Sequence, residues 1–583
     1  MPVLRRFDGK TLADFQNPQQ EPGMERRLLL VFAITFLIIL ASQPLLKKYG
    51  PKTPETPPPA QNQVVNPTPQ AAVTAAVPSP VAGAKQASSE AETVVENDLY
   101  KIRFTNRGAQ VKSWVLKKFK DDKGQPLELV NSNAAAKYGY PLSLWIYDEA
   151  LRNKVNSALF VRAPDEGDSL SAPASLSFEY SDGDLEVRKT FKFDHSYVLA
   201  VETSVVQKGS SVTALPMWPA GFGDENNPAS YAAARAEYQN GNDVERTALK
   251  KVTGGNTIRG PFQWAGVSDQ YFAAVFLPED PSGALFVTQR SALDNPQDAK
   301  HPLEVLGAGV GQLGGTTVER MYVGPKALDV LESVPVVGLP AGTEPDLRKL
   351  VDFGWLGLIA RPLFLWLKWT YNHIVPNWGW AIVIQTLIIN LALLPLRISQ
   401  MKSMLKMQRV APQIKAIQEK YKKYSMRDPR KQAMNEEIAA IYKTEGVNPA
   451  GGCLPLIIQM PFLFAYYRML GVALDLRLAH WAWVPDLSSP DPYHILPIAV
   501  IISMLFMQRM TPQAGMDPQQ QKMMNLFMPV MLGFISWNLA AGLCLYWSIG
   551  NLIGIVQQLV MNRTQLGRDM REMMEKRARK KDK

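Results

Sequence analysis

The 583-residue chain has little of the chemistry on which most enzymes depend. Its two cysteines, Cys453 and Cys544, both lie in apolar stretches, so they predict neither a disulfide framework nor a zinc site. Its five histidines lack the HExxH spacing of zinc proteases, and there is no P-loop motif GxxxxGK(S/T). We therefore predict no catalytic centre, no metal, no cofactor and no specific nucleic-acid site.

Apolar stretches are long and numerous, and hydrophobic residues make up 46% of the chain. Residues 28–46 carry no charge over about the length that a membrane span needs. Their apolar core is longer than that of a usual signal peptide, and no clear small-residue cleavage site follows. We therefore favour an uncleaved signal-anchor over a cleaved signal peptide, with residues 1–27 as a cytoplasmic segment.

Two regions of different composition follow this first span. Residues 47–93 are rich in Pro, Ala, Gln and Ser and cannot bury a core, so they should form an extended linker. From 94 to 335, short runs such as LEVRKTFKF alternate apolar and polar residues between Gly, Asn, Asp and Pro. This period of two predicts a large antiparallel β-sandwich.

Charge sets the expected topology of the apolar remainder. Segment 397–447 has a net charge of +7 and the tail 562–583 one of +5, whereas loop 472–494 has one basic residue against three acidic ones. Because positive loops face the cytoplasm, the first two should lie inside and the third outside. Residues 523–561 must then cross the bilayer twice, and their length permits this.

The same reasoning allows only one crossing between the β-rich region and the basic segment. Residues 345–376, with several Trp residues beside Arg361 and Lys368, should therefore form an amphipathic helix in the outer interface. The predicted architecture is a multi-domain membrane protein with an α-helical bundle, an outside β-domain and both termini in the cytoplasm. Its six spans are 28–46, 377–397, 452–472, 494–510, 523–538 and 541–561, the last five forming a core over 377–561.

Residues 398–447 predict a basic cytoplasmic helical hairpin. A first helix carries apolar residues three and four apart from Met407 onward, and a second helix, with Asp428 as its N-cap, presents Ile438 and Ile441. Its basic surface fits two alternatives that the sequence leaves open. One is contact with anionic lipid headgroups, and the other is docking of the ribosome, a nascent chain or another acidic partner.

Three predicted spans carry hydrogen-bonding side chains in their cytoplasmic halves. Thr386 and Asn390 are four residues apart and share a helix face, Gln459 reaches a similar depth on the next span, and Asn551 lies on the last. Such groups can simply join packed helices, each bond contributing about 0.6 kcal/mol on average. Because the outer halves stay apolar, we favour a wetted cavity that opens to the cytoplasm.

The stretch KTEGVNPAGGCLPLIIQMPFLFAYY at 443–467 closely resembles the YidC membrane protein insertase family. Supporting stretches include NWGWAIVIQTLIINLALLPL at 377–396 and GLCLYWSIGNLIGIVQQ at 542–558. The resemblance covers roughly 94–561. It implies insertion and folding of nascent membrane proteins in the inner membrane, alone or with the Sec translocon, through a hydrophilic groove open to cytoplasm and lipid. It also implies a periplasmic super-β-sandwich.

In one respect the sequence departs from this family. The groove usually carries an arginine where this chain has Asn390, so we expect its fixed positive charge to be absent. Trp547 stands where the family often has a groove-facing aromatic residue, and packing within the last hairpin explains it equally well. The expected groove residues are Thr386, Asn390, Gln459, Trp547 and Asn551.

Two other functions fit the sequence less well than that of an insertase. A transporter or channel is the main alternative, but the sequence has neither an inverted repeat nor a charged pair at the midplane. A periplasmic sugar enzyme is disfavoured, because the β-rich region contains only His195 and His301 and no evident paired acid and base.

Overall fold

The computed structural model describes residues 84–121, 123–163, 167–223, 234–294, 302–334, 344–424, 428–446, 454–510, 523–565, 568 and 572. Outside these ranges lie the predicted cytoplasmic segment 1–27, the signal-anchor 28–46, most of the linker 47–93 and most of the tail 562–583. The described chain is β-rich up to residue 325 and helical from residue 347 onward.

Three sheets make up the β-rich part. The first has the order β4 (Pro126–Glu128), β3 (Gln110–Lys120), β2 (Tyr100–Thr105), β1 (Glu92–Glu96), β7 (Ser169–Ser171). The second has the order β14 (Asp243–Ala248), β13 (Arg235–Asn240), β16 (Trp264–Ser268), β17 (Phe272–Pro278), β20 (Thr317–Pro325), β10 (Val198–Gln207), β9 (Leu185–Phe193), β8 (Ala174–Ser181), β6 (Val161–Ala163), with β11 (Ser210–Ser211) paired to β10. The third has the order β15 (Thr257–Arg259), β18 (Ala284–Leu293), β19 (Leu303–Gln312), β12 (Leu215–Trp218), β5 (Leu144–Trp145).

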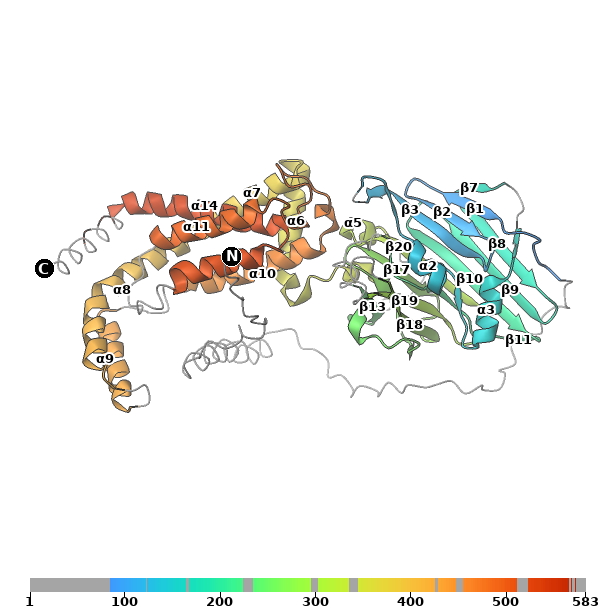
Figure 1. Cartoon of the computed structure of the whole chain (residues 1–583), viewed down its shortest axis with the longest axis horizontal. Helices are drawn as coiled ribbons and strands as arrows, with labels where there is room; N and C mark the ends of the chain where they lie inside the picture. Colours follow the sequence, from blue (N-terminus) through green and yellow to red (C-terminus); the bar gives the residue numbers. More distant parts are fainter. Residues whose placement is uncertain are drawn as a thin grey trace, which may run out of the picture. The chain divides into compact units, whose positions relative to one another are not determined.

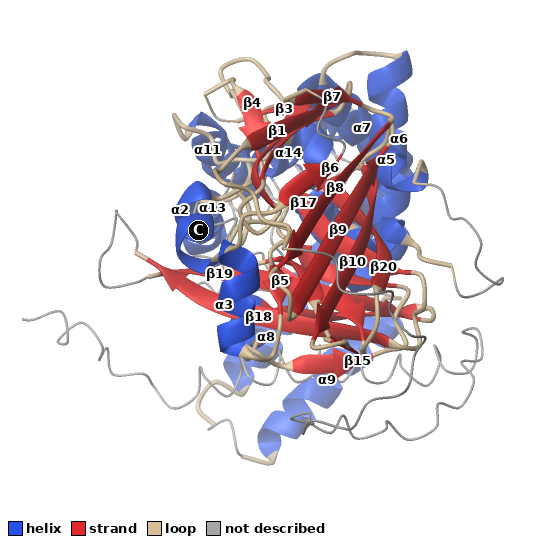
Figure 2. Cartoon of the chain, turned by 90° about the vertical axis from the view of Figure 1, so that its right-hand side faces the viewer, coloured by secondary structure: helices blue, strands red, loops and turns tan. Residues whose placement is uncertain are grey.

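Four short helical segments lie among or just after these strands: α2 (Ser132–Tyr138), α3 (Glu149–Ser157), η2 (Leu249–Lys251) and α5 (Leu328–Glu332). Figure 2 shows β8, β9, β10 and β20 side by side in the second sheet. All pairs are antiparallel among the described strands except β1 and β7, which run parallel over a short stretch. At this edge the structure differs from the predicted antiparallel sandwich over 94–335. A hairpin would force two strands to be antiparallel, but β1 and β7 are not joined by one, so they can run parallel.

Burial alternates from residue to residue along the strands, so that one strand face packs into a shared apolar core. In β9, every second residue from Leu185 to Phe193 is buried. Phe104 on β2 contacts Phe191 on β9, with ring centroids 5.1 Å apart, which joins the first sheet to the second. Trp114 on β3 meets Trp218 on β12 edge to face, which joins the first sheet to the third.

The helical part follows at the yellow-to-red end of the chain (Figure 1). It contains η3 (Leu347–Leu350), η4 (Gly354–Leu356), α6 (Gly357–His373), α7 (Trp378–Ala392), α8 (Leu394–Lys420), α9 (Arg430–Thr444), α10 (Leu454–Val472), η6 (Leu474–Leu476), α11 (Ile495–Met510), the π-helical turn η7 (Met523–Phe527), α13 (Met528–Ser536) and α14 (Ala541–Arg563).

By length and composition, α14 is the one described helix that is long and apolar enough to cross a bilayer by itself. The segment Gly354–His373 and α7 pass the same test only together, and they are bent by 120°. The apolar helices Ile495–Met510 and Asn525–Ser536 are shorter. The described helices therefore do not by themselves establish six spans.

The predicted continuous helix over 377–397 is interrupted. Helix α7 ends at Ala392, and α8 begins at Leu394 with Pro395 in its first turn, four residues before the predicted start of the hairpin at 398. Proline has no N–H and cannot continue the hydrogen bonds of α7, and the first turn of a new helix accommodates it without a lost bond.

Helices α8 and α9 contact each other through a small apolar cluster. Val410 and Ile414 are buried there against Met407, Ile438 and Ile441. Helix α9 begins at Arg430, with Pro429 at the N-cap position where Asp428 is predicted, and the Asp428 carboxylate accepts from the Arg430 N–H at 3.0 Å. The pairing follows from the three-and-four spacing of the first helix.

Candidate functional site in the helical part

A row of polar side chains lies where α7, α11 and α14 pack together. Helix α14 contacts both α7 and α11 (Figure 1). Gly550 of α14 faces the polar side of α7: a Cβ there would lie in van der Waals contact, 3.9 Å from Thr386 Cγ2 and from Asn390 Nδ2.

Thr386 and Asn390 are buried on that face and bond first to their own helix. The Thr386 hydroxyl donates to the carbonyl of Ile382 at 2.6 Å, and Asn390 Nδ2 donates to the carbonyl of Thr386 at 2.8 Å. Both side chains thereby satisfy donors inside an apolar helix. Asn390 keeps its Oδ1 as an acceptor for other elements.

The last helix adds further polar contacts to this row. Gln557 Nε2 donates to the carbonyl of Asn390 at 3.3 Å, whereas Gln557 Oε1 is buried without a hydrogen-bond partner. Asn551 Nδ2 donates to Ser503 Oγ on α11 at 3.0 Å. Helix α14 thus hydrogen-bonds to α7 through Gln557 and to α11 through Asn551.

A positive charge is present beside Asn390, so the expectation of an uncharged cluster is wrong. Arg397, in the first turns of α8, donates from Nη2 to Asn390 Oδ1 at 3.2 Å. Gly554 faces the same guanidinium, and a Cβ there would come within 2.7 Å of Nη1. From the sequence, Arg397 is expected only to mark the inner edge of a span. The sequence does indicate this contact, because Arg397 follows Asn390 by seven residues, which is about two helical turns.

Gln385 is a second polar residue that the expected groove set did not include. It is fully buried, donates from Nε2 to the carbonyl of Leu363 on α6 at 3.0 Å, and accepts at Oε1 from the Tyr466 hydroxyl on α10. Tyr466 in turn stacks on Tyr546, with ring centroids 4.1 Å apart. Gln385 therefore joins α6, α7 and α10, and no sequence pattern indicates partners so far along the chain.

The remaining two predicted groove residues lie on other helices and are less buried than Thr386 and Asn390. Gln459 on α10 and Trp547 on α14 are both half-buried, as is Asn551. No hydrogen bond connects Gln459 or Trp547 to Asn390. The structure thus brings Thr386 and Asn390 together and places Gln459 and Trp547 outside their hydrogen-bonded row.

Arg468 on α10 is a second arginine of the helical part, and it has a different partner. Its Nη2 lies 3.2 Å from the Asp352 carboxylate, which also binds Arg235 of β13 at 2.8 Å. This ion-paired network connects α10 to the β-rich part. Arg468 is therefore not available as a charge for the Asn390 cluster.

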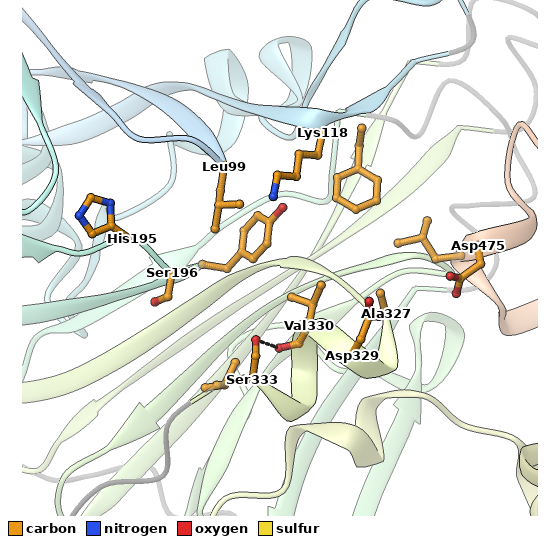
Figure 3. Close-up of a pocket in the computed structure, with 13 residues that line it drawn as sticks. Leu99, Lys118, His195, Ser196, Ala327, Asp329, Val330, Ser333 and Asp475 are labelled. Carbon is orange, nitrogen blue, oxygen red and sulfur yellow. Dashed lines mark hydrogen bonds between the residues drawn. The ribbon is translucent and has the colours of Figure 1, made fainter. Parts of the chain in front are cut away.

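A cavity of about 470 Å³ lies beside α5 and η6, and Figure 3 shows Lys118, His195, Asp329 and Asp475 among the residues that line it. Both carboxylates are paired with Lys368, at 3.1 Å from Asp329 and 3.4 Å from Asp475. Sugar chemistry needs an acid and a base that are free to exchange protons. These two carboxylates are instead held in one ion-paired cluster.

Comparisons with known proteins cover both parts of the chain. Residues 92–366 match the family model described as the YidC periplasmic domain, and residues 369–568 match the one described as 60Kd inner membrane protein. The membrane protein insertase YidC of Syntrophus aciditrophicus (strain SB) is 32% identical over 88% of this chain and 91% of that protein. The membrane protein insertase YidC of Geobacter metallireducens is 32% identical over 93% and 99%.

Among solved structures, the active YidC insertase whose first transmembrane domain is resolved aligns with 83% of this chain and 95% of its own, at 19% identity and a TM-score of 0.33. The sequence relatives decide the assignment, because their identity of 32% extends over nearly the full length of both proteins. The resemblance found in the sequence is confirmed, and the chain belongs to the YidC membrane protein insertase family.

Proposed function

We propose that this protein inserts and folds nascent integral membrane proteins in the inner membrane, alone or with the Sec translocon. The observation that carries the proposal is the polar row of Thr386, Asn390 and Gln557 with the Arg397 guanidinium, set among otherwise apolar helices. Polar groups inside a membrane are costly and mark the paths of polar cargo. This row would solvate the polar part of a client while it crosses.

The groove would have a buried floor and more accessible walls. Thr386 and Asn390 form the floor, and the half-buried Gln459, Trp547 and Asn551 supply the walls. Side chains such as Leu387 and Leu391, on another face of α7, are about half exposed and would contact lipid. Helix α7 would thus present one face to lipid and another to the client.

We propose the full topology in the same terms. Six spans (28–46, 377–397, 452–472, 494–510, 523–538, 541–561) would leave both termini in the cytoplasm and the β-domain 94–335 in the periplasm. Helix α6 would lie in the outer interface. Its bend of 120° from α7 supports this, as do the exposed side chains of Trp355, Leu358 and Trp369.

The α8–α9 hairpin and the basic tail 562–583 would contact the ribosome and anionic lipids. No residue of α9 is fully buried, so its basic surface is available to such partners.

Topology can be tested by single-cysteine labelling, since only Cys453 and Cys544 must first be replaced. A membrane-impermeant thiol reagent should label Ser282→Cys in intact spheroplasts, and Lys415→Cys only after lysis. The reverse pattern would refute the proposed orientation.

A depletion-rescue experiment tests the function itself. Cells depleted of their own insertase should grow on the wild-type chain, grow poorly on Asn390→Ala, and grow on Asn390→Arg. Alanine removes the acceptor beside Arg397, whereas arginine restores hydrogen bonding and charge. Full growth on Asn390→Ala would show that the polar row is not needed.

A further inference from the structure

We propose that a cavity between β14, η3 and the start of α6 binds the head group of an aminophospholipid of the outer leaflet. Lys349 and Arg361 would bind its phosphate, and Asp243 and Glu245 its ammonium group. This site is separate from the polar row of the proposed groove. The choice of a lipid rests on the topology proposed above, in which α6 lies in the outer interface.

The cavity has a volume of about 850 Å³, which is within the range of small-molecule sites, about 300–1,000 Å³. Its walls come from β14, which is the edge strand of the second sheet, from η3 and from the first turns of α6. Hydrogen bonds join these walls. Lys349 Nζ donates to the carbonyl of Asn242 at 2.9 Å, and the Arg246 guanidinium donates to the carbonyl of Lys349. The cavity is therefore part of the fold.

Two carboxylates of the cavity are available to a cationic ligand. Asp243 and Glu245 are two residues apart on β14, so their side chains share one face of the strand, and both are exposed. Within the described part of the chain, neither forms an ion pair. The other carboxylates of the lining, Asp346 and Asp352, are each paired with an arginine at 2.8 Å.

Two cations of the cavity are likewise available to an anionic ligand. Lys349 keeps two of its three N–H donors after its bond to Asn242. Arg361 Nη2 lies 3.7 Å from Glu332, and because both side chains are half-exposed this pair is weak. The other arginines of the lining, Arg246 and Arg348, are bound to carboxylates at 3.0 and 2.8 Å. Lys349 and Arg361 can therefore receive a phosphate.

The rim of the cavity indicates a lipid rather than a soluble ligand. Leu358 lines the cavity and is 90% exposed, and Trp355 beside it is 88% exposed. Exposed apolar side chains of this kind suit the boundary between head groups and acyl chains. Because carboxylates and cations are both available, a head group with both charges is complementary to the cavity. An ethanolamine ammonium has N–H donors for Asp243 and Glu245, whereas a choline has none.

The test uses the purified full-length chain in detergent and mass spectrometry of intact protein–lipid complexes. Phosphatidylethanolamine should be retained roughly tenfold more than phosphatidylcholine or phosphatidylglycerol with the same acyl chains. Asp243→Asn with Glu245→Gln should remove the preference for phosphatidylethanolamine over phosphatidylcholine. Lys349→Gln with Arg361→Gln should lower retention of phosphatidylethanolamine roughly tenfold. Asp184→Asn with Lys192→Gln, at exposed positions beside and on β9, is the matched control and should change nothing.

The outcomes separate the possible explanations. Equal retention of the three lipids by the wild-type chain, or equal retention by all variants, would overturn the inference. Displacement of the lipid by free phosphoethanolamine at the same concentration would overturn it in favour of a soluble ligand. If the Lys349 and Arg361 variant does not fold, the lipid series on the wild-type chain and the Asp243 and Glu245 variant decide.

Failure of the proposed function is distinguishable from failure of this site, because lipid retention in detergent requires neither a client nor a bilayer. A chain that inserts no client but keeps the head-group preference would refute the insertase proposal alone. Reversed labelling of Ser282→Cys would overturn the assignment to the outer leaflet together with the topology.

Discussion

Two cations, Lys189 buried in the β-rich part and Arg397 partly buried in the helical part, show how differently the two parts use charge. Lys189 of β9 is buried, and its three N–H donors reach the carbonyls of Gly108 at 2.7 Å, Ala109 at 3.2 Å and Leu142 at 2.7 Å. Arg397 of the helical part uses one of five donors. A fully satisfied cation is part of the fold, whereas an unsatisfied one is available to a ligand.

The largest expected effect concerns Lys189. Lys189→Met keeps the volume but leaves three buried carbonyls without a donor, so the β-domain should lose about 2–4 kcal/mol of unfolding free energy. Denaturant unfolding of the full chain in detergent, followed by tryptophan fluorescence, measures this loss. Lys192→Met, at an exposed position of the same strand, is the control. An unchanged midpoint for Lys189→Met would mean that the lysine is not structural.

The same lysine predicts a dependence on pH. Burial lowers the pKa of Lys189 from 10.5 to about 7, so the unfolded chain binds more protons between these values. Stability should therefore rise with pH across this window, and Lys189→Met should lack the rise. Parallel slopes for the two proteins, measured in the same unfolding experiment between pH 7 and 10, would contradict the low pKa.

Gly554→Ala tests whether the position of the Arg397 guanidinium matters, and it should have a smaller effect than Lys189→Met. The new methyl group must displace the guanidinium or Met507 Cε, which would lie 2.6 Å away. Client insertion should fall severalfold, while overall stability changes little. Insertion rates in vesicles measure the effect, with Gly471→Ala as the control because no atom lies within 4 Å of a Cβ there. Equal insertion by both variants would show that the position of Arg397 is not important.

The smallest effect is expected at the surface of the basic hairpin. Lys420 pairs with Glu437 at 2.8 Å between α8 and α9, but both side chains are exposed. Such pairs contribute little, so Glu437→Gln should leave the thermal midpoint of the full chain unchanged. A clear drop in the midpoint would show that the hairpin depends on this ion pair more than on the apolar contact of Val410 and Ile414.

The comparison of Lys189 with Arg397 also shows what the sequence could and could not predict. Period-two alternation in LEVRKTFKF predicts the β-strand and puts Lys189 on its inward face, but the three acceptors come from residues 47 to 81 positions away. Thr386 and Asn390 could be placed on one face from their spacing of four residues. The helix break before Pro395 and the pairing of Gln385 with Tyr466 depend on local chain geometry and tertiary packing, which periodicity does not encode.

Site-specific crosslinking to a stalled nascent membrane protein tests the central claim most directly. Photo-crosslinkers would replace Asn390, Gln459 and Trp547 in turn, with Leu552, a half-exposed position on the apolar surface of α14, as the control. The proposed groove predicts strong client crosslinks from the first three positions and weak ones from the fourth. Crosslinks from Leu552 alone would show that clients pass along a lipid-facing surface and not through the polar row.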